Sequence, residues 1–176
     1  LRQPLKTTGY RAWLSSYVGG IAQTGGSGSL PAPPELLAAP GYVARRLHQS
    51  YVAAWVRLVD ATLTGPQFAV LTAVNAYPGV EQGSLASSVA LDRSTMASIV
   101  RRLEDRRLIT RETPAEDGRK RLLFLTEDGI ETLRDADRRA RELDVLLMKG
   151  YDPARQDALL RELTALSEHW ESLVDD

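Results

Sequence analysis

The segment between Gln82 and Thr126 limits the possible folds most strongly, because its pattern changes from helical to β-prone within one stretch. Residues 82–89 predict a short helix, and Asp92 can cap a second helix that runs to Arg107. Two short β-prone runs, LITRET and KRLLFLT, then flank PAEDGR, which is rich in turn residues. A short helix, a turn and a second helix form a helix-turn-helix, and the hairpin that follows is a wing.

Helical spacing continues on both sides of this segment, so the predicted fold class is mainly α with a small β-hairpin wing. Apolar residues recur at helical intervals from Pro34 to Ala61, where Pro40-Gly41 can bend or restart the helix. Thr64, Thr126 and Asp152 can cap three further helices. The predicted parts are an N-terminal extension with a Gly/Ser linker (1–33), a helical segment (34–61), the winged helix-turn-helix (62–125) and C-terminal helices (126–176). The alternative for the extension is an ordered arm with a short helix near residues 10–18.

Composition argues against several classes of protein. The chain has no cysteine, which removes disulfides, thiolate nucleophiles and thiol redox sensing. Its two histidines, His48 and His169, leave little material for a metal site or a catalytic triad. The sequence contains neither G-x-x-x-x-G-K-[ST] nor G-x-G-x-x-G, the glycine motifs that bind nucleotide phosphates. No apolar run approaches the roughly 20 residues that span a bilayer. We therefore expect a cytoplasmic domain with no membrane partner, no enzymatic activity, no metal and no cofactor.

Charge is distributed unevenly, although the formal net charge is only -1. Residues 92–121 hold nine Lys/Arg and six Asp/Glu, a balance of +3, whereas residues 126–176 hold seven and fourteen, a balance of -7. A basic segment inside a near-neutral chain favours a polyanionic partner. The alternative is a solvated basic face.

On a helix, residues 92–107 separate into an apolar face and a polar face. The apolar face should pack on the preceding helices and consists of Met96, Ile99, Val100 and Leu103. The polar face consists of Ser94, Thr95, Ser98, Arg101 and Arg102. Short hydroxyl side chains allow close entry into the major groove, and arginine can read guanine or hold a phosphate. This pattern predicts a DNA-recognition helix.

The hairpin adds a second basic group, formed by Arg119, Lys120 and Arg121 at or just after its tip. A basic hairpin beside a recognition helix can reach the adjacent minor groove. Asp117 precedes Arg119 by two residues and can hold its guanidinium in place. Two other interpretations remain: a surface hairpin with an exposed ion pair, and a helical protein-interaction module that does not bind specific DNA.

From Pro34 to Val174 the chain resembles the MarR family of winged helix-turn-helix transcriptional regulators. The most specific match is the wing pattern DGRKRLLFLT, with Asp117, Arg119 and the Leu125-Thr126 pair in the expected places. LDRSTMASIVRRLEDRRLI also matches the recognition helix of the family, except that Arg107 stands where members often have glycine.

The resemblance implies a homodimer that binds double-stranded DNA. Residues 34–61 and 126–176 would form its helical dimerisation region. Two recognition helices would then meet half-sites about 34 Å apart in a pseudo-palindromic operator, with repression as the default outcome. The alternative is a purely intramolecular helical bundle.

A narrower resemblance concerns the ligand. Three segments are similar to the branch of the family that responds to protocatechuate and related aromatic acids: GYVARRLHQSYVAAW, LTGPQFAVLTAV and LDRST. This implies a small phenolic or aromatic acid as effector, with Arg45 clamping its carboxylate, His48 nearby and Trp55 lining the pocket. Tyr51 stands where that branch can use histidine. Alternatively, Tyr51 and Trp55 belong to a dimer core and His48 is a satisfied polar group.

Overall fold

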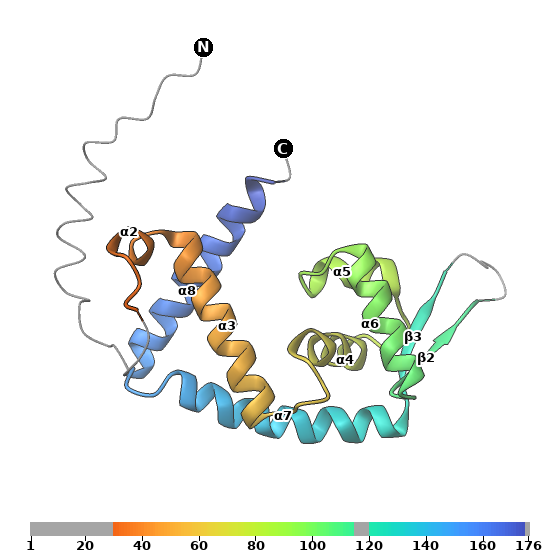
Figure 1. Cartoon of the computed structure of the whole chain (residues 1–176). Coiled ribbons are helices and arrows are strands. Elements are labelled where there is room, and N and C mark those ends of the chain that lie inside the picture. The colour runs from red at the N-terminus through yellow and green to blue at the C-terminus, as the bar shows by residue number, and fades with distance from the viewer. Residues whose placement is uncertain (1–29, 115–119, 175–176) are drawn as a thin grey trace, which may run out of the picture. The chain divides into compact units, whose positions relative to one another are not determined.

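The computed structural model describes residues 30–114 and 120–174, so residues 1–29 of the predicted extension, Asp117 and Arg119 lie outside the described residues. Two compact units are present, one ending at Ala53 and one spanning Ala54–Asp176. The helices (Figure 1) are α2 (Pro34–Leu37), α3 (Pro40–Leu58), α4 (Gly65–Ala76), α5 (Gln82–Ser88), α6 (Arg93–Asp105), α7 (Glu127–Leu147) and α8 (Pro153–Ser172). The strands are β1 (Val80–Glu81), β2 (Ile109–Glu112) and β3 (Leu122–Leu125). The predicted fold class is therefore confirmed.

In the first unit, proline sets the start of both helical pieces. Pro34 occupies the first turn of α2, and α3 starts again at Pro40, as the Pro-Gly pair predicts. Tyr42 lies in the first turns of α3, where its ring faces two guanidinium groups: the Cζ atoms of Arg45 and Arg46 are 5.5 and 5.9 Å from the ring centroid. Both contacts are within the range of a cation–π interaction.

In the second unit, the predicted capping residues start four helices. Thr64 forms a capping box with Gln67, and Asp92 accepts hydrogen bonds from backbone N–H groups at the start of α6. Thr126 and Asp152 cap α7 and α8 in the same way, and Pro153 follows the second of these caps. Each cap satisfies backbone donors that the helix itself leaves without a partner.

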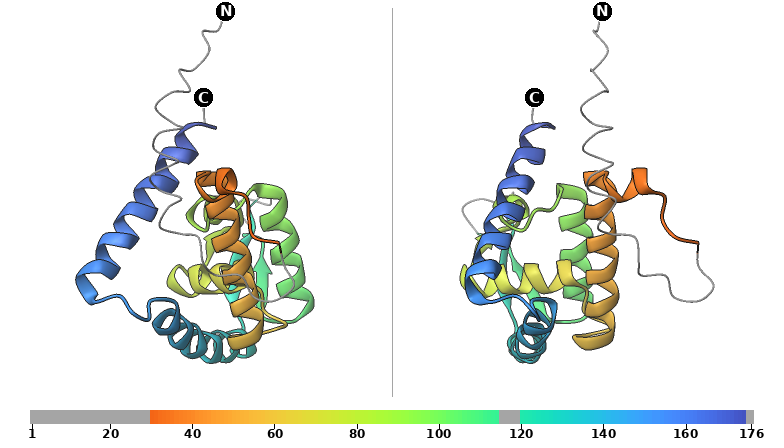
Figure 2. Two further views of the ribbon diagram at one scale, coloured as in Figure 1. Left: turned by 60° about the vertical axis from the view of Figure 1, so that its left-hand side comes forward. Right: turned by 90° about the vertical axis from the view of Figure 1, so that its left-hand side faces the viewer.

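One hydrophobic core joins α4, α5, α6, the sheet and α7. Figures 1 and 2 show α4, α5 and α6 grouped beside the sheet, with the first turns of α7 beneath them. All four residues of the predicted apolar face of α6 are buried in this core. They pack in one cluster with Val70, Leu71 and Val74 of α4, Leu85 of α5, Leu123 of β3, and Leu133, Ala136, Ala140 and Leu143 of α7. Burial of α6 on this side leaves its polar face outward.

The sheet has three strands in the order β1-β3-β2, whereas the sequence predicts only a two-stranded hairpin. The extra strand is two residues long and pairs Val80 with Leu123 and Glu81 with Leu122. Gly79 makes this approach possible with a positive φ of 78°, and its N–H donates to the carbonyl of Leu123. A two-residue strand has no recognisable alternation, so its sequence carries no strand signal.

The wing leads directly into α7 through a tight junction. Thr126 donates its side-chain hydroxyl to the carbonyl of Arg107, and its backbone N–H donates to the carbonyl of Leu108. A Cβ atom at Gly129 would overlap with that same carbonyl of Leu108. The glycine of the EDG sequence is therefore required by close backbone approach.

Two non-glycine residues of the second unit adopt left-handed backbone conformations. Ala90 has φ 52° in the turn between α5 and α6, and Arg107 has φ 57° just after α6. Left-handed geometry costs an L-residue about 1–2 kcal/mol, whereas glycine adopts it freely. The glycine that the family resemblance leads one to expect at the position of Arg107 would adopt this conformation without strain.

We expect Arg107→Gly to stabilise the protein. Relief of about 1–2 kcal/mol of strain exceeds the roughly 0.5–1 kcal/mol entropy cost of glycine, leaving a net gain of about 0.5–1 kcal/mol. Urea unfolding followed by circular dichroism measures this. Arg106→Gly is the matched control, because Arg106 has φ -84° and donates to the carbonyl of Thr62, so it should destabilise. A destabilised Arg107→Gly variant would contradict the strain argument.

Candidate nucleic-acid interface

The start of α6 is organised by the carboxylate of Asp92. Its Oδ1 accepts from the backbone N–H groups of Ser94 and Thr95, each at 2.9 Å, and from the Ser94 hydroxyl at 2.6 Å. Its Oδ2 accepts from the Thr95 hydroxyl. The side-chain hydrogen bonds from Ser94 and Thr95 are the main reason why the pKa of Asp92 lies well below its ordinary value of 3.8. The carboxylate is therefore ionised at neutral pH.

The two arginines of the predicted recognition face point away from the core. Arg101 and Arg102 are both exposed, while Val100 and Leu103 on either side of them are buried. In the range 30–114 and 120–174, neither guanidinium takes part in a hydrogen bond or ion pair. Both can therefore meet an anionic partner without first breaking an internal contact. Ser98, one turn before Arg102, is half-buried on the same helix.

An ion pair that the sequence does not reveal ties α6 to the wing. Glu104, in the last turn of α6, bonds to the guanidinium of Arg111 on β2. The partner of Glu104 thus lies on the next strand and not on its own helix. This contact links β2 to the last turn of α6.

Basic side chains continue onto the described part of the wing. Lys120 is exposed, and Arg121 is half-buried and donates to the carbonyl of Lys120 at 2.9 Å. Arg119 and its predicted partner Asp117 lie outside the described residues, so their roles stay predictions. The described wing thus contributes at least two cationic groups beside the α6 face.

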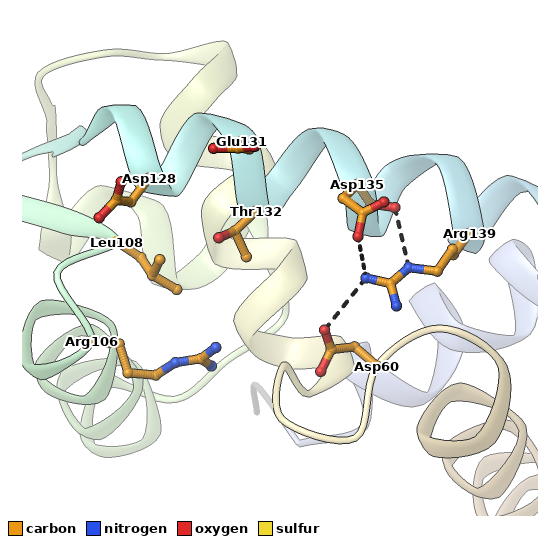
Figure 3. A pocket seen from close by; sticks show the side chains of 8 residues that line it. All are labelled: Asp60, Arg106, Leu108, Asp128, Glu131, Thr132, Asp135 and Arg139. Atoms are coloured by element: carbon orange, nitrogen blue, oxygen red, sulfur yellow. Dashed lines mark hydrogen bonds and ion pairs between the residues drawn. The ribbon is translucent and has the colours of Figure 1, made fainter.

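Not every arginine of the basic segment is available to a partner. Arg106 donates through Nη1 to the carbonyl of Thr62 at 2.9 Å, which joins the end of α6 to the α3–α4 loop. It lines a polar cleft of about 520 Å³ (Figure 3) together with Asp60, Leu108, Asp128, Glu131, Thr132, Asp135 and Arg139. Arg106 therefore has a structural role. The local charge balance alone cannot distinguish such an arginine from one that is free to contact DNA.

The same cleft contains a second brace between the α3–α4 loop and α7. Arg139 lies 2.6 Å from a carboxylate oxygen of Asp135 and 3.7 Å from one of Asp60 (Figure 3). Burial raises the pKa of Asp60, but hydrogen bonds from Thr62 and Leu63 and the charge of Arg139 outweigh it, so the net shift is downward. Asp60 is therefore held as an anion that fixes the loop.

The four predicted ligand residues occupy different environments along α3. Arg45 and His48 are exposed, and Tyr51 is 37% exposed. Trp55 is only 3% exposed, its indole N–H donates to the carbonyl of Leu63 at 2.6 Å, and its ring centroid lies 5.1 Å from that of Phe68. Trp55 thus belongs to the core of the second unit, and its donor is already used. Its predicted contact with a ligand stays a prediction.

A second cleft, of about 420 Å³, lies between α4 and α7 and was not anticipated from the sequence. It is lined by Thr72, Asn75, Ile130, Leu133, Arg134, Asp137 and Arg141. Arg141 is paired with Asp137 at 2.8 Å, whereas Arg134 has no hydrogen-bond or ion-pair partner among the described residues. The cleft therefore combines apolar side chains with one available guanidinium.

Neither membrane nor metal chemistry is indicated in the described parts. Among residues 30–114 and 120–174, no helix is long and apolar enough to cross a bilayer. The same residues contain no group of three or more His, Cys, Asp or Glu side chains placed to hold a metal ion.

A three-stranded wing beside an exposed arginine-bearing helix, both mounted on one core, defines a winged helix-turn-helix DNA-binding protein. Residues 63–120 match the sequence model of the MarR family. The structure of PcaV from Streptomyces coelicolor, in complex with its natural ligand, is 31% identical, with a TM-score of 0.74 over 80% of this chain and 98% of PcaV. The chain belongs to the MarR family and is a transcriptional regulator, not an enzyme.

Two further structures connect this fold to DNA and to a small aromatic acid. The transcriptional repressor CouR, bound to a 23-mer DNA duplex, is 28% identical, with a TM-score of 0.71 over 79% of this chain and 99% of CouR. BpsR of Bordetella bronchiseptica, whose DNA binding is regulated by 6-hydroxynicotinic acid, is also 28% identical. Its TM-score is 0.66 over 72% of this chain and 97% of BpsR.

Proposed function

We propose that this regulator is a cytoplasmic homodimeric repressor that occupies a pseudo-palindromic operator and is released from it by a small phenolic or aromatic acid. The observation that carries the proposal is the outer face of α6. Arg101 and Arg102 are held outward by burial of the opposite face and have no internal partner among the described residues. Ser94, Thr95 and Ser98 precede them on the side that would enter the major groove first.

The wing supplies the second part of this DNA surface. Lys120 and Arg121, with Arg119 as a predicted neighbour, would contact the phosphates or minor groove next to the site read by α6. Asp117 would position Arg119. The ion pair between Glu104 and Arg111 supports a fixed spacing between helix and wing. A helical interaction module without DNA binding has no use for the guanidinium groups of Arg101 and Arg102, which have no internal partner among the described residues.

Loss of both arginines should weaken DNA binding and reduce its salt dependence. We expect Arg101→Ala/Arg102→Ala to lower affinity for DNA from the upstream region of the gene by at least about 100-fold. Each phosphate contact that is lost should also flatten the plot of log affinity against log salt by about 0.9. Fluorescence anisotropy of labelled DNA at several salt concentrations measures both quantities.

Arg138→Ala/Arg161→Ala removes the same charge from α7 and α8 and serves as the matched control. If the control variant weakens binding as much as the α6 variant, long-range charge and not the α6 face is responsible. If the wild-type protein shows no salt-dependent binding at all, the interaction-module alternative is correct.

Exposed apolar surface supports the homodimer. Val145, Leu146 and Leu147 at the end of α7 are 73%, 53% and 45% exposed. On α8 no residue is buried, although Leu159, Leu163, Leu166, Trp170 and Leu173 recur at helical spacing. A contiguous apolar stripe of this kind marks an interaction surface, and a second copy of the chain would cover it.

A charge on this stripe should dissociate the dimer. Leu166→Arg would bury an unpaired guanidinium in the interface, at a cost of about 3 kcal/mol or more, which raises the dimer Kd over 100-fold. Sedimentation at micromolar concentration measures the change. Glu168→Arg, on the opposite side of α8, should leave the association state unchanged. Equal behaviour of the two variants would place the interface elsewhere.

For the effector, we propose that Arg45 clamps the carboxylate. Its guanidinium is exposed and can form two parallel hydrogen bonds to a carboxylate. His48, one turn later, and Tyr51 can contact ring substituents, and Trp55 follows Tyr51 by four residues on the same helix. The aromatic acid that regulates BpsR supports this class of ligand. A ligand releases DNA only if it binds more tightly to the conformation with mismatched recognition-helix spacing.

Arg45→Ala should therefore weaken the response to the aromatic acid without weakening DNA binding. A charge-assisted hydrogen bond is worth about 1.5–3 kcal/mol, so the ligand concentration for release should rise about 10- to 100-fold. A panel of hydroxybenzoates and hydroxycinnamates titrated into the protein–DNA complex measures this.

Arg46→Ala is the control, because Arg46 is the next residue and also faces the Tyr42 ring. If Arg134→Ala abolishes the response and Arg45→Ala does not, the carboxylate binds in the cleft between α4 and α7 instead. A panel without any active member would refute this ligand class.

A further inference from the structure

We infer that Asp92 makes Ser94 and Thr95 into hydrogen-bond acceptors only, so that they select DNA bases carrying an amino group in the major groove, adenine or cytosine. This rests on the proposed entry of α6 into the groove and adds a base preference to it. The fold and the family indicate that the ligand is DNA. The inference concerns which chemical groups of DNA these two side chains can bind.

The hydroxyl hydrogens of Ser94 and Thr95 are both used in bonds to Asp92. A serine or threonine hydroxyl has one donor hydrogen and two lone pairs. Ser94 Oγ lies 2.6 Å from Asp92 Oδ1, and Thr95 Oγ1 bonds to Asp92 Oδ2. An ionised carboxylate can only accept, so both hydroxyls must donate to it. The low pKa of Asp92 keeps the carboxylate ionised at neutral pH. Each hydroxyl then offers DNA lone pairs and no hydrogen.

The cap formed by Asp92 holds these hydroxyls in place. Asp92 also accepts the backbone N–H groups of Ser94 and Thr95 at 2.9 Å, so its carboxylate is fixed relative to the first turn of α6. Rotation of the Thr95 hydroxyl toward DNA would take its hydrogen bond away from Oδ2, and rotation of the Ser94 hydroxyl would remove one of the three donors to Oδ1. Ser94 is nevertheless exposed and Thr95 half-buried, so lone pairs of both can face a partner.

The groups that DNA presents differ in whether they donate or accept hydrogen bonds. Phosphate oxygens, guanine O6 and N7, adenine N7 and thymine O4 only accept hydrogen bonds, so hydroxyls without a free hydrogen cannot bind them. The donors in the major groove are adenine N6 and cytosine N4, and each base pair presents one of them. The position of that amino group depends on the strand. A fixed acceptor therefore separates A or C from G or T at the contacted base.

The test is selection of binding sites from a randomised DNA pool with the full chain. For the wild-type protein we expect one or two positions per half-site restricted to A or C. Ser94→Ala and Thr95→Val should each remove one restriction, lowering the preference for amino bases about fivefold, the usual effect of one hydrogen bond. The rest of the selected motif should not change. A motif without such positions would overturn the inference.

Asp92→Asn separates this idea from a simple capping role. The amide oxygen of asparagine can keep the backbone N–H bonds, but its nitrogen cannot accept from a hydroxyl. We expect the Thr95 hydroxyl to be freed as a donor, so that G or T becomes acceptable at its position while circular dichroism shows a folded protein. An unchanged base preference in this folded variant would overturn the inference. So would a Ser94→Ala variant that binds all DNA sequences equally more weakly, because that result indicates phosphate contact.

A modified duplex gives a second measurement. In the selected site, the contacted adenine is replaced by purine, which lacks the 6-amino group. Wild-type affinity should fall about fivefold, and Ser94→Ala or Thr95→Val should show no further fall at its own position. Additive losses would overturn the inference. If the wild-type protein selects no motif, the proposed DNA-binding function fails; a motif lacking A or C restrictions defeats only this base preference.

Discussion

Burial of one side of α6 determines how the rest of the DNA-binding unit is arranged. Met96, Ile99, Val100 and Leu103 are almost completely removed from solvent, and they are packed against α4, α5, the sheet and α7. A helix with 3.6 residues per turn that buries these positions must turn the intervening ones outward. Exposure of Arg101 and Arg102 is therefore a consequence of core packing. The wing follows directly from the end of this helix, so its position also depends on that packing.

Arginines close together in the sequence have separate tasks in this structure. Arg101 and Arg102 are unpaired among the described residues, Arg106 holds the α3–α4 loop, and Arg111 binds Glu104 on the recognition helix. Arg106 and Arg111 hold the neighbouring loop and strand against α6, and Arg101 and Arg102 are exposed on that helix. Most of these contacts are partly exposed, so each adds only about 0–1 kcal/mol to stability. Their greater effect is on geometry, because DNA recognition requires helix and wing at a defined spacing.

The exposed apolar residues and the exposed guanidinium groups give the chain surfaces for two kinds of partner. The apolar residues of α7 and α8 suit a second copy, and the cationic residues of α6 and the wing suit DNA. In the proposed function, the negative charge from residue 126 onward would repel DNA from the C-terminal helices and favour its binding to the basic segment. An effector can couple these surfaces only by preferring one dimer geometry, which is why its binding residues must be tested through DNA release.

The sequence alone determined the order of the main helices and of the two-stranded hairpin, because capping residues and helical apolar spacing act over a few residues. Thr64, Asp92, Thr126 and Asp152 all start helices as predicted, and the inner face of α6 follows from its period. Tertiary structure alone decided contacts between residues far apart in the chain. Examples are the pairing of β1 with β3, the bond from Arg106 to Thr62, and the core position of Trp55. Local pattern shows that an arginine is on a surface, but its partner depends on which distant backbone group folds beside it.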